Sequence, residues 1–252
     1  MELIVELAEL VAAQAGVGRD MLERAEYAMT SMQDVRRLIQ EHGWALLVVG
    51  SSGDLQAAHV PCLLDPVHDA GGAANQLVII GHTARADPVV SALRSGQEVL
   101  LVFQGPNGYI SPAWYGEGPS PPTWNFTAVH VRGIPEVLEG GEAFSVLERT
   151  VEHFEAARDD PWQLCGDGLA YARRIAQETA PFRVRSAAIQ AKAKLSQDKP
   201  RRIQDRVIAA LQERGPYQNA QVAGEMRRVL GEPTGTASPT KDQVGAPVQR
   251  HA

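Results

Sequence analysis

The segment from residue 99 to residue 133 constrains the fold of this chain more than any other part of it. Two β-rich runs flank a loop that is dense in glycine, proline and aromatic residues. The second run carries polar side chains where an ordinary core strand has apolar ones, namely Asn125, Thr127, His130 and Arg132. Aromatic, amide and imidazole groups that gather at a loop-to-strand junction are typical of a site for a flat cofactor. We therefore expect the function to reside in this segment.

The other apolar runs also have the length and composition of β-strands, and few helices separate them. One short helix is expected among them, beginning at Asp87-Pro88 and ending by Gly96. A doubly wound parallel sheet would need a helix after nearly every strand. The sequence therefore predicts an α+β fold built on a small closed barrel of mostly antiparallel strands. These strands are expected at residues 44–50, 55–64, 76–82, 98–104, 108–112 and 124–138.

Helical periodicity flanks the predicted barrel on both sides along the chain. Helices are expected at residues 2–14, 30–43, 141–158, 166–178, 200–214 and 218–230, with a further strand near 181–187. A basic cluster at residues 192–206 is interpreted as a solvated helix face, because two aspartates interrupt it. We expect four units, which are a helical N-terminal extension (1–26), a barrel domain (27–192), C-terminal helices (193–230) and a disordered tail (231–252).

Composition excludes several classes of protein. The net charge of −6 argues against a nucleic-acid partner, because such proteins usually carry a basic footprint. No apolar run has the roughly 18 to 20 residues of a membrane span, and the N-terminus lacks the basic leader of a signal peptide. Cys62 and Cys165 form neither a disulfide framework nor a zinc motif. We therefore expect a cytoplasmic protein without a membrane partner.

The sequence contains none of the common nucleotide, hydrolase or metalloprotease motifs, since it has no GxGxxG, GxxxxGK[ST], GxSxG or HExxH. Three histidines, His59, His82 and His130, lie on predicted strands, but their spacing is not that of metal ligands, so a shared metal would depend on the fold. Arg85 precedes a helix N-terminus, where it could bind a phosphate or propionate or simply lie in a surface loop.

The period of a strand assigns side chains of the 124–133 run to two faces. One face receives Trp124, Phe126, Ala128, His130 and Arg132, and the other receives the residues between them, including Asn125. The first face can present stacking aromatics together with an imidazole. The alternative is that its aromatic residues are ordinary core.

Five segments together resemble the PaiB-type family, whose members are described as FMN-binding negative transcriptional regulators with a split β-barrel. They are HVP (59–61), GHTARADP (81–88), VFQGPNGYISPAWY (102–115), PTWNFTAVHVRG (122–133) and KLSQ (194–197). The resemblance covers roughly residues 27 to 230. It implies a split barrel that is usually a homodimer, with its cofactor site near the subunit interface.

The chain departs from the regulator pattern at three motif positions. Asp87 replaces the usual Asn before Pro88, Asn107 replaces a histidine, and Phe126 replaces a tyrosine. With these departures, its acidic net charge and its overall similarity, the chain resembles the piperazate synthase branch of the family, which uses haem instead of FMN. These enzymes cyclise side-chain N-hydroxy-L-ornithine to L-piperazic acid by forming an N–N bond with loss of water. The resemblance therefore implies a haem b enzyme of lyase type with a small-molecule substrate.

The resemblance also implies roles for the candidate residues. His59 is the expected axial ligand of the haem iron, with His130 and His82 as alternatives, and Arg85 would hold a haem propionate or an FMN phosphate. Asn125 would also contact the cofactor. The expected catalytic residues are Arg132, which could hold the substrate carboxylate, Tyr109, which would wall the pocket together with Trp124, and His130, while the general base is left unassigned. Two alternatives remain open, a PaiB-like FMN-binding regulator or flavin protein and a cofactor-free dimeric interaction protein.

Overall fold

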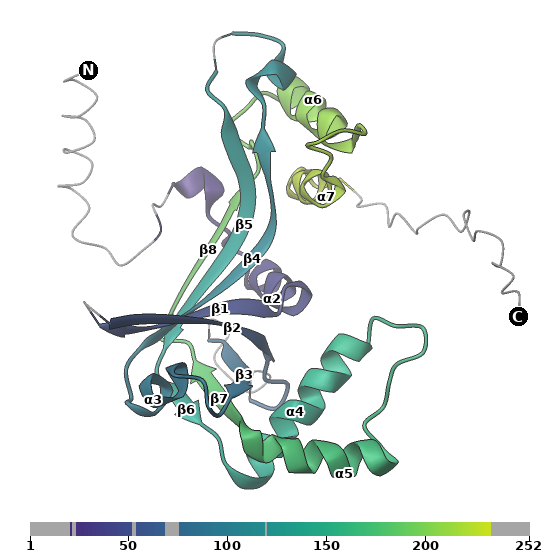
Figure 1. Cartoon of the computed structure of the whole chain (residues 1–252). Coiled ribbons are helices and arrows are strands. Elements are labelled where there is room, and N and C mark those ends of the chain that lie inside the picture. Colours follow the sequence, from purple (N-terminus) through teal and green to yellow (C-terminus); the bar gives the residue numbers. More distant parts are fainter. Residues whose placement is uncertain (1–20, 22–23, 52–53, 69–75, 119, 233–252) are drawn as a thin grey trace, which may run out of the picture.

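A computed structural model describes residues 21, 24–51, 54–68, 76–118 and 120–232 (Figure 1). Eight strands form one sheet in the order β6-β7-β3-β2-β1-β4-β5-β8, and every neighbouring pair is antiparallel. The predicted α+β split-barrel class, with flanking helices, is confirmed. The strands are β1 (Trp44–Ser51), β2 (Asp54–Leu64), β3 (Val78–Ala84), β4 (Val99–Ile110), β5 (Thr123–Gly133), β6 (Pro135–Val137), β7 (Thr179–Arg185) and β8 (Ala188–Lys194).

Alternation along the strands decides which face of the sheet is buried. In β1, Ala45, Leu47 and Val49 are buried while the residues between them are partly exposed, and β4 alternates in the same way. The buried set packs into one core together with residues of β2, β3, β5 and β7. We call this side of the sheet the core face. The opposite side of β2, β1, β4, β5 and β8 is called the outer face.

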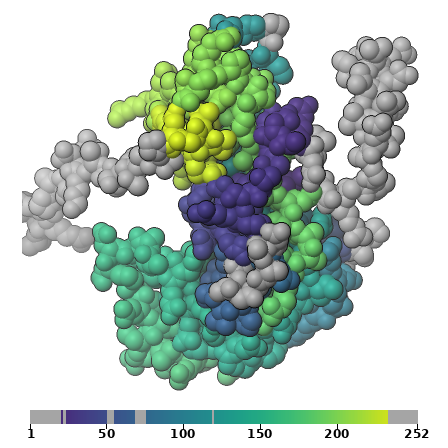
Figure 2. All heavy atoms as spheres, turned by 180° about the vertical axis from the view of Figure 1, so that it is seen from behind, coloured from purple at the N-terminus to yellow at the C-terminus, as the bar shows by residue number. Residues whose placement is uncertain are grey.

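Helices pack on both sides of the sheet, because Val35 and Leu38 lie in the main core, whereas Val146 packs against Leu63 and Ile80, which project from the opposite side of the sheet. The longest helices and their bounds are α2 (Met32–Glu41), α4 (Gly140–Glu155), α5 (Gly166–Ile175), α6 (Arg201–Gln212) and α7 (Ala220–Val229), beside the short α3 (Val89–Arg94) and the 3-10 turns η1 (Ala25–Tyr27), η2 (Pro112–Tyr115) and η3 (Ala176–Glu178). Figure 1 shows α2, α6 and α7 on one side of the long strands β4, β5 and β8. Seen from behind, α2 lies between the upper part formed by α6 and α7 and the lower part formed by α4 and α5 (Figure 2).

Two helix starts follow the expected capping chemistry. The Ser31 hydroxyl accepts a hydrogen bond from the backbone N–H of Asp34, which begins α2 where the sequence predicted a helix. The Asp87 carboxylate accepts from the N–H of Val89 at the start of α3. These bonds satisfy N–H groups that have no partner inside the helix.

Several expected element boundaries were wrong. The predicted strands 98–104 and 108–112 are one strand, β4, because the chain crosses residues 105–107 with an irregular register against β5 instead of leaving the sheet. The predicted strand 124–138 is divided into β5 and β6 at the exposed Ile134. Residues 192–194 are not on a helix face but in β8, where lysines alternate with alanines that face the core.

The predicted helix 2–14, most of the 1–26 extension and nearly all of the 231–252 tail lie outside the described residues. Within the described part of the chain, no helix is long and apolar enough to cross a membrane.

Candidate functional site

The outer face brings the predicted site residues of three strands onto one surface. Reading across the sheet, His59, Leu46, Val102, His130 and Gln190 are successive partners from β2 through β1, β4 and β5 to β8. Residues directly opposite each other in antiparallel strands project to the same side. The outer face therefore presents two imidazoles in one row, with apolar side chains between them.

His59 lies exposed on β2 at one end of this row. Its ring stacks on that of Trp44 with 6.1 Å between centroids and 17° between planes, and Trp44 itself is 63% exposed. Ala57, two residues before His59 on the same face, is also exposed and leaves space above the strand. An exposed imidazole that is held by a neighbouring ring and has open space beside it can reach a bound ligand.

His130 lies half-buried on β5, and its surroundings favour the neutral ring. Burial lowers the pKa of His130 below its ordinary value, and the nearby positive charge of Arg132 lowers it further. A neutral imidazole keeps a lone pair on one ring nitrogen and can accept a proton or bind a metal. Arg132 follows on the same face, where its guanidinium lies 4.0 Å from the Glu98 carboxylate.

His59 and His130 cannot bind one metal ion within a subunit. Three inter-strand steps separate them, which is about 14 Å at the usual strand spacing of about 4.8 Å. Metal–nitrogen bonds are about 2 Å long. Accordingly, the described residues contain no cluster of three or more metal-binding side chains.

Aromatic side chains gather at the upper end of the outer face. Trp124, 55% exposed, meets Tyr109 edge to face with 6.4 Å between ring centroids. Tyr109 also contacts Tyr217, in the turn between α6 and α7, which in turn meets Trp114. The sequence predicted the pairing of Trp124 and Tyr109 on one wall, but not the contribution of Tyr217, because that residue is more than 90 positions away.

His82 and Arg85 lie outside the row that joins the other two histidines. His82 is on β3 opposite Pro181, where burial lowers the pKa of its ring and Nδ1 has no hydrogen-bond partner among the described residues. The Arg85 guanidinium donates to the carbonyl of Gln177 at 2.7 Å and lies 3.6 Å from Glu139. In the structure Arg85 thus contacts the end of the α5–η3 segment. The sequence had suggested that this side chain could bind an anion instead.

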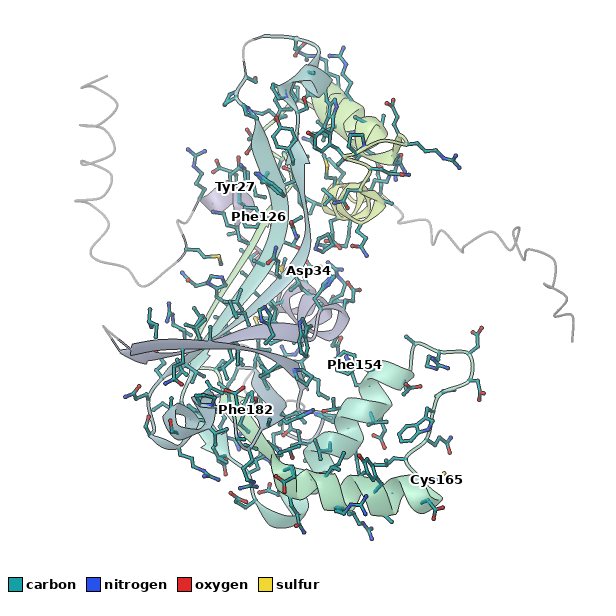
Figure 3. All side chains as sticks on the ribbon, in the orientation of Figure 1. Tyr27, Asp34, Phe126, Phe154, Cys165 and Phe182 are labelled. Carbon is teal, nitrogen blue, oxygen red and sulfur yellow. The ribbon has the colours of Figure 1, made fainter. Side chains whose placement is uncertain are left out.

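Asn125 lies on the core face and does not reach the outer face. It is fully buried; its amide donates to Ser196 Oγ at 3.0 Å and to Met226 Sδ at 3.4 Å, and its carbonyl accepts from the Ser196 hydroxyl at 3.1 Å. Asn125 therefore lies apart from the outer-face row, because successive strand residues project to opposite sides, and its expected contact with a cofactor stays a prediction. Figure 3 shows its neighbour Phe126 on the long strands.

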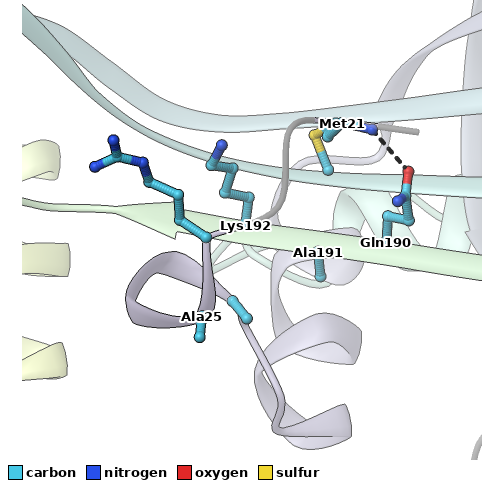
Figure 4. A pocket seen from close by; sticks show the side chains of 7 residues that line it. Met21, Ala25, Gln190, Ala191 and Lys192 are labelled. Atoms are coloured by element: carbon cyan, nitrogen blue, oxygen red, sulfur yellow. Dashed lines mark hydrogen bonds between the residues drawn. The ribbon is translucent and has the colours of Figure 1, made fainter. Parts of the chain in front are cut away.

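A cavity of about 360 Å³ borders the outer face at the edge of β8 (Figure 4). Met21 and residues 24–28 lie along this edge, and the Met21 N–H donates to Gln190 Oε1 at 3.1 Å. Arg24 and Lys192 line the cavity, and the Lys192 ammonium lies 5.8 Å from the centre of the Phe126 ring. The sequence analysis missed this edge, although the alternation in AIQAKAK (188–194) is a strand signal.

The outer face fits a planar anionic group such as haem or FMN. Half-buried apolar side chains of β1 and β4 form its middle, and aromatic rings form its upper end. Cationic side chains of β5, β8 and the N-terminal segment lie along it, in a chain whose net charge is negative. Apolar surface suits the ring system and the cations suit propionate or phosphate groups. Haem also requires an axial ligand, which an imidazole on this face can provide, whereas FMN does not.

Comparison with known families and proteins gives consistent matches. A family model described as "Putative FMN-binding domain" matches residues 21–187. The protein named "Protease synthase and sporulation protein PAI 2" of Bacillus subtilis is 30% identical over 188 residues, covering 74% of this chain and 86% of that protein. An uncharacterized protein of Emericella nidulans is 24% identical over 230 residues, covering 77% of this chain and 92% of its own length.

Among solved structures, the FAD and heme binding protein from Mycobacterium smegmatis is similar, with a TM-score of 0.49 and 16% identity. That alignment covers 72% of this chain and 78% of the other.

Proposed function

This chain belongs to the PaiB-type family of FMN-binding domains, and from that premise we propose that its outer face holds a planar prosthetic group, haem b, and that it acts as a piperazate synthase. The proposed substrate is side-chain N-hydroxy-L-ornithine. Its α-amine forms a bond to the side-chain nitrogen while the N–O bond breaks, one water leaves, and no electron donor or acceptor is consumed.

The row that contains His59 and His130 carries this proposal. Haem needs an axial ligand from the protein, and imidazole is a common one. His59 supports that role best, because its ring is exposed, oriented by Trp44 and adjacent to small side chains. FMN needs no axial ligand, so binding of a flavin alone would not account for the histidines in this row.

When bound, haem iron would supply a Lewis acid that weakens the N–O bond of the substrate. The residues of the chain would transfer the proton, exclude water and bind carboxylate groups. His130, whose lowered pKa keeps it neutral, can accept the proton released by the attacking amine. Trp124 and Tyr109 would exclude bulk water at the upper end, and Arg132 would bind a carboxylate of the cofactor or the substrate.

We also propose that a second copy of the chain covers part of the outer face in a homodimer. Trp44, Leu55 and Trp124 are 63%, 73% and 55% exposed in the single chain. These side chains project from one side of the sheet, where a second copy of the chain could bury them. Light scattering of the purified protein should give twice the mass of the chain, and a monomer at working concentration would contradict the dimer.

An absorption spectrum of the purified protein tests the cofactor assignment first. Haem b predicts a strong Soret band, whereas FMN predicts the two-band spectrum of a yellow protein. A colourless protein after haem and FMN have both been supplied would exclude both assignments. Incubation with N-hydroxy-L-ornithine should then give a product lighter by one water, measured by mass spectrometry.

His59→Ala tests the axial ligand. We expect loss or a large shift of the Soret band and loss of turnover, with a melting temperature close to that of the parent because His59 is exposed. His153→Gln is the control, since His153 lies on α4, where its ring contacts the Gln40 carbonyl and the Phe154 ring. If His59→Ala keeps both the spectrum and the turnover, His59 is not the ligand.

A further inference from the structure

The acidic groups of the proposed cofactor need a cationic partner on the outer face other than Arg85. The Arg85 guanidinium donates to the Gln177 carbonyl and pairs with Glu139, so it already has partners beside β3. Arg132 can bind one carboxylate, but haem b carries two propionates. The cavity beside Met21 brings two further cations to the edge of the outer face.

Two side chains of β8 project from the outer face and line this cavity. Gln190 is the direct partner of His130, and Lys192 is the direct partner of Ala128. Figure 4 shows the Gln190 and Lys192 side chains on the same side of β8, with Ala191 on the other. Diagonal neighbours across an antiparallel pair lie about 7 to 8 Å apart, so the base of Lys192 is close to His130.

The lining of the cavity combines an apolar surface with positive charge. Its apolar part is formed by small or flexible side chains, namely Met21, Ala25, Ala28 and Ala191. Arg24 and Lys192 supply two positive charges, and the described residues of the lining include no carboxylate. An apolar surface beside cations suits the edge of a planar ring system that carries acidic groups.

Positive charges are crowded along this part of β8. Lys194 follows Lys192 on the same face of the strand. Burial lowers the pKa of Lys194, and the positive charges of Lys192 and Arg24 lower it further, while Asp198 acts in the opposite direction. The Lys192 ammonium lies 5.8 Å from the centre of the Phe126 ring, which favours a position above β5. An anion bound among these cations would offset their mutual repulsion.

The distance from His59 favours the cofactor over the substrate as the source of that anion. Four inter-strand steps separate His59 from Gln190, which is about 19 Å at a strand spacing of about 4.8 Å. A small amino acid bound to an iron on His59 would not reach this edge of the sheet. A planar group lying over β1 and β4 would bring its periphery toward β5 and β8, where the long Lys192 side chain can meet it.

We propose that Lys192, together with Gln190 and Arg24, binds the acidic group of the planar cofactor on the outer face. That group is a propionate of haem b or the phosphate of FMN. The proposal rests on the proposed function in requiring such a cofactor, but it holds for either one. Lys192 would donate to the acid oxygens, and the Gln190 amide, whose Oε1 accepts from the Met21 N–H, would donate through Nε2.

Absorbance titration of the full-length protein, prepared without cofactor, tests this contact with pairs of ligands that differ in the acidic group. Haem b is compared with its dimethyl ester, and FMN with riboflavin. We expect Lys192→Met to weaken binding of the acidic ligand about 10-fold and to leave binding of the neutral ligand unchanged. Lys192→Arg should restore most of the affinity, because it keeps a positive charge that donates hydrogen bonds. From the haem-loaded protein, transfer of haem to apomyoglobin should be about 10-fold faster for Lys192→Met than for the parent.

Arg24→Met is the second variant, in case Lys192→Met fails to fold. Its effect should be smaller, about 2- to 5-fold, because the Arg24 side chain is 61% exposed and exposed charges interact weakly. Arg158→Met is the matched control, because its side chain is 62% exposed and pairs with Glu155 at 3.1 Å. Arg24 pairs with Glu26 in the same way, at 3.4 Å. Arg158 lies between α4 and α5, away from β8 (Figure 1), so this variant should leave all affinities unchanged.

The outcomes separate this proposal from the proposed function. Unchanged binding of the acidic ligand to Lys192→Met, or an equal loss for the acidic and the neutral ligand, would overturn the anion site. If the parent carries haem and cyclises N-hydroxy-L-ornithine while Lys192→Met raises only KM, the function stands and Lys192 serves the substrate instead. If the parent binds FMN but not haem, and Lys192→Met weakens FMN but not riboflavin, the anion site stands and the proposed function is wrong. A parent protein that binds neither cofactor would overturn both.

Discussion

The contact between Asn125 and Ser196 provides the most quantitative test of the structure. Asn125 is fully buried and Ser196 is 3% exposed, and the two side chains exchange hydrogen bonds of 3.0 and 3.1 Å. Asn125→Ala removes both bonds and leaves a buried hydroxyl without a partner. At about 1 kcal/mol for each bond, and about 1 to 3 kcal/mol for an unsatisfied buried group, we expect a loss of about 3 to 5 kcal/mol.

For a chain of this size, that loss corresponds to a decrease in melting temperature of roughly 6 to 20 °C, at about 2 to 4 °C per kcal/mol. Urea unfolding followed by circular dichroism measures the free energy of unfolding directly. The position of the cofactor absorption band should not change, because Asn125 faces away from the outer face. A shifted band would instead support the cofactor contact that the sequence suggested for Asn125.

Ser196→Gly provides the second arm of the test. Ser196 has φ of +64°. Glycine adopts positive φ without strain, which offsets about 1 to 2 kcal/mol of the loss of the two hydrogen bonds, so we expect Ser196→Gly to destabilise the protein less than Asn125→Ala does. In the Ser196→Gly background, Asn125→Ala should cost about 1 to 2 kcal/mol less than alone, because the two side chains are coupled. Equal losses in both backgrounds, or a loss below about 1 kcal/mol for Asn125→Ala, would refute the reasoning.

Three further predictions follow from buried groups elsewhere in the fold. Asp65→Ala should lower the free energy of unfolding by about 3 to 5 kcal/mol, measured by urea titration, because it removes a buried partner of the Arg183 guanidinium. Burial lowers the pKa of His82 from its ordinary 6.5, so the folded state favours the neutral ring; this stabilisation is complete above about pH 6.5 and is lost as the pH falls below it. Accordingly, the parent should lose stability more steeply than His82→Gln between about pH 7 and pH 5, and parallel curves would contradict this. Gly105→Ala should cost about 1 to 3 kcal/mol in thermal unfolding, because its Cβ would overlap a threonine hydroxyl on β5, whereas the control Gly141→Ala, with open space around it, should not destabilise.

The sequence alone determined the strand periodicity and therefore the two faces of β5. Alternation placed Trp124, His130 and Arg132 on one side and Asn125 on the other, and the structure has them there. Local turn and capping chemistry placed the starts of α2 and α3. These features depend on neighbours within a few residues, so they can be read from the chain directly.

Tertiary structure decided which of these residues meet. Two strands separate His59 from His130, and that spacing depends on the sheet order, in which β1 and β4 lie between β2 and β5. Asn125 meets Ser196 across 71 residues because β8 pairs with β5 at the sheet edge. Strand order is set by how the whole core packs, and periodicity carries no information about it.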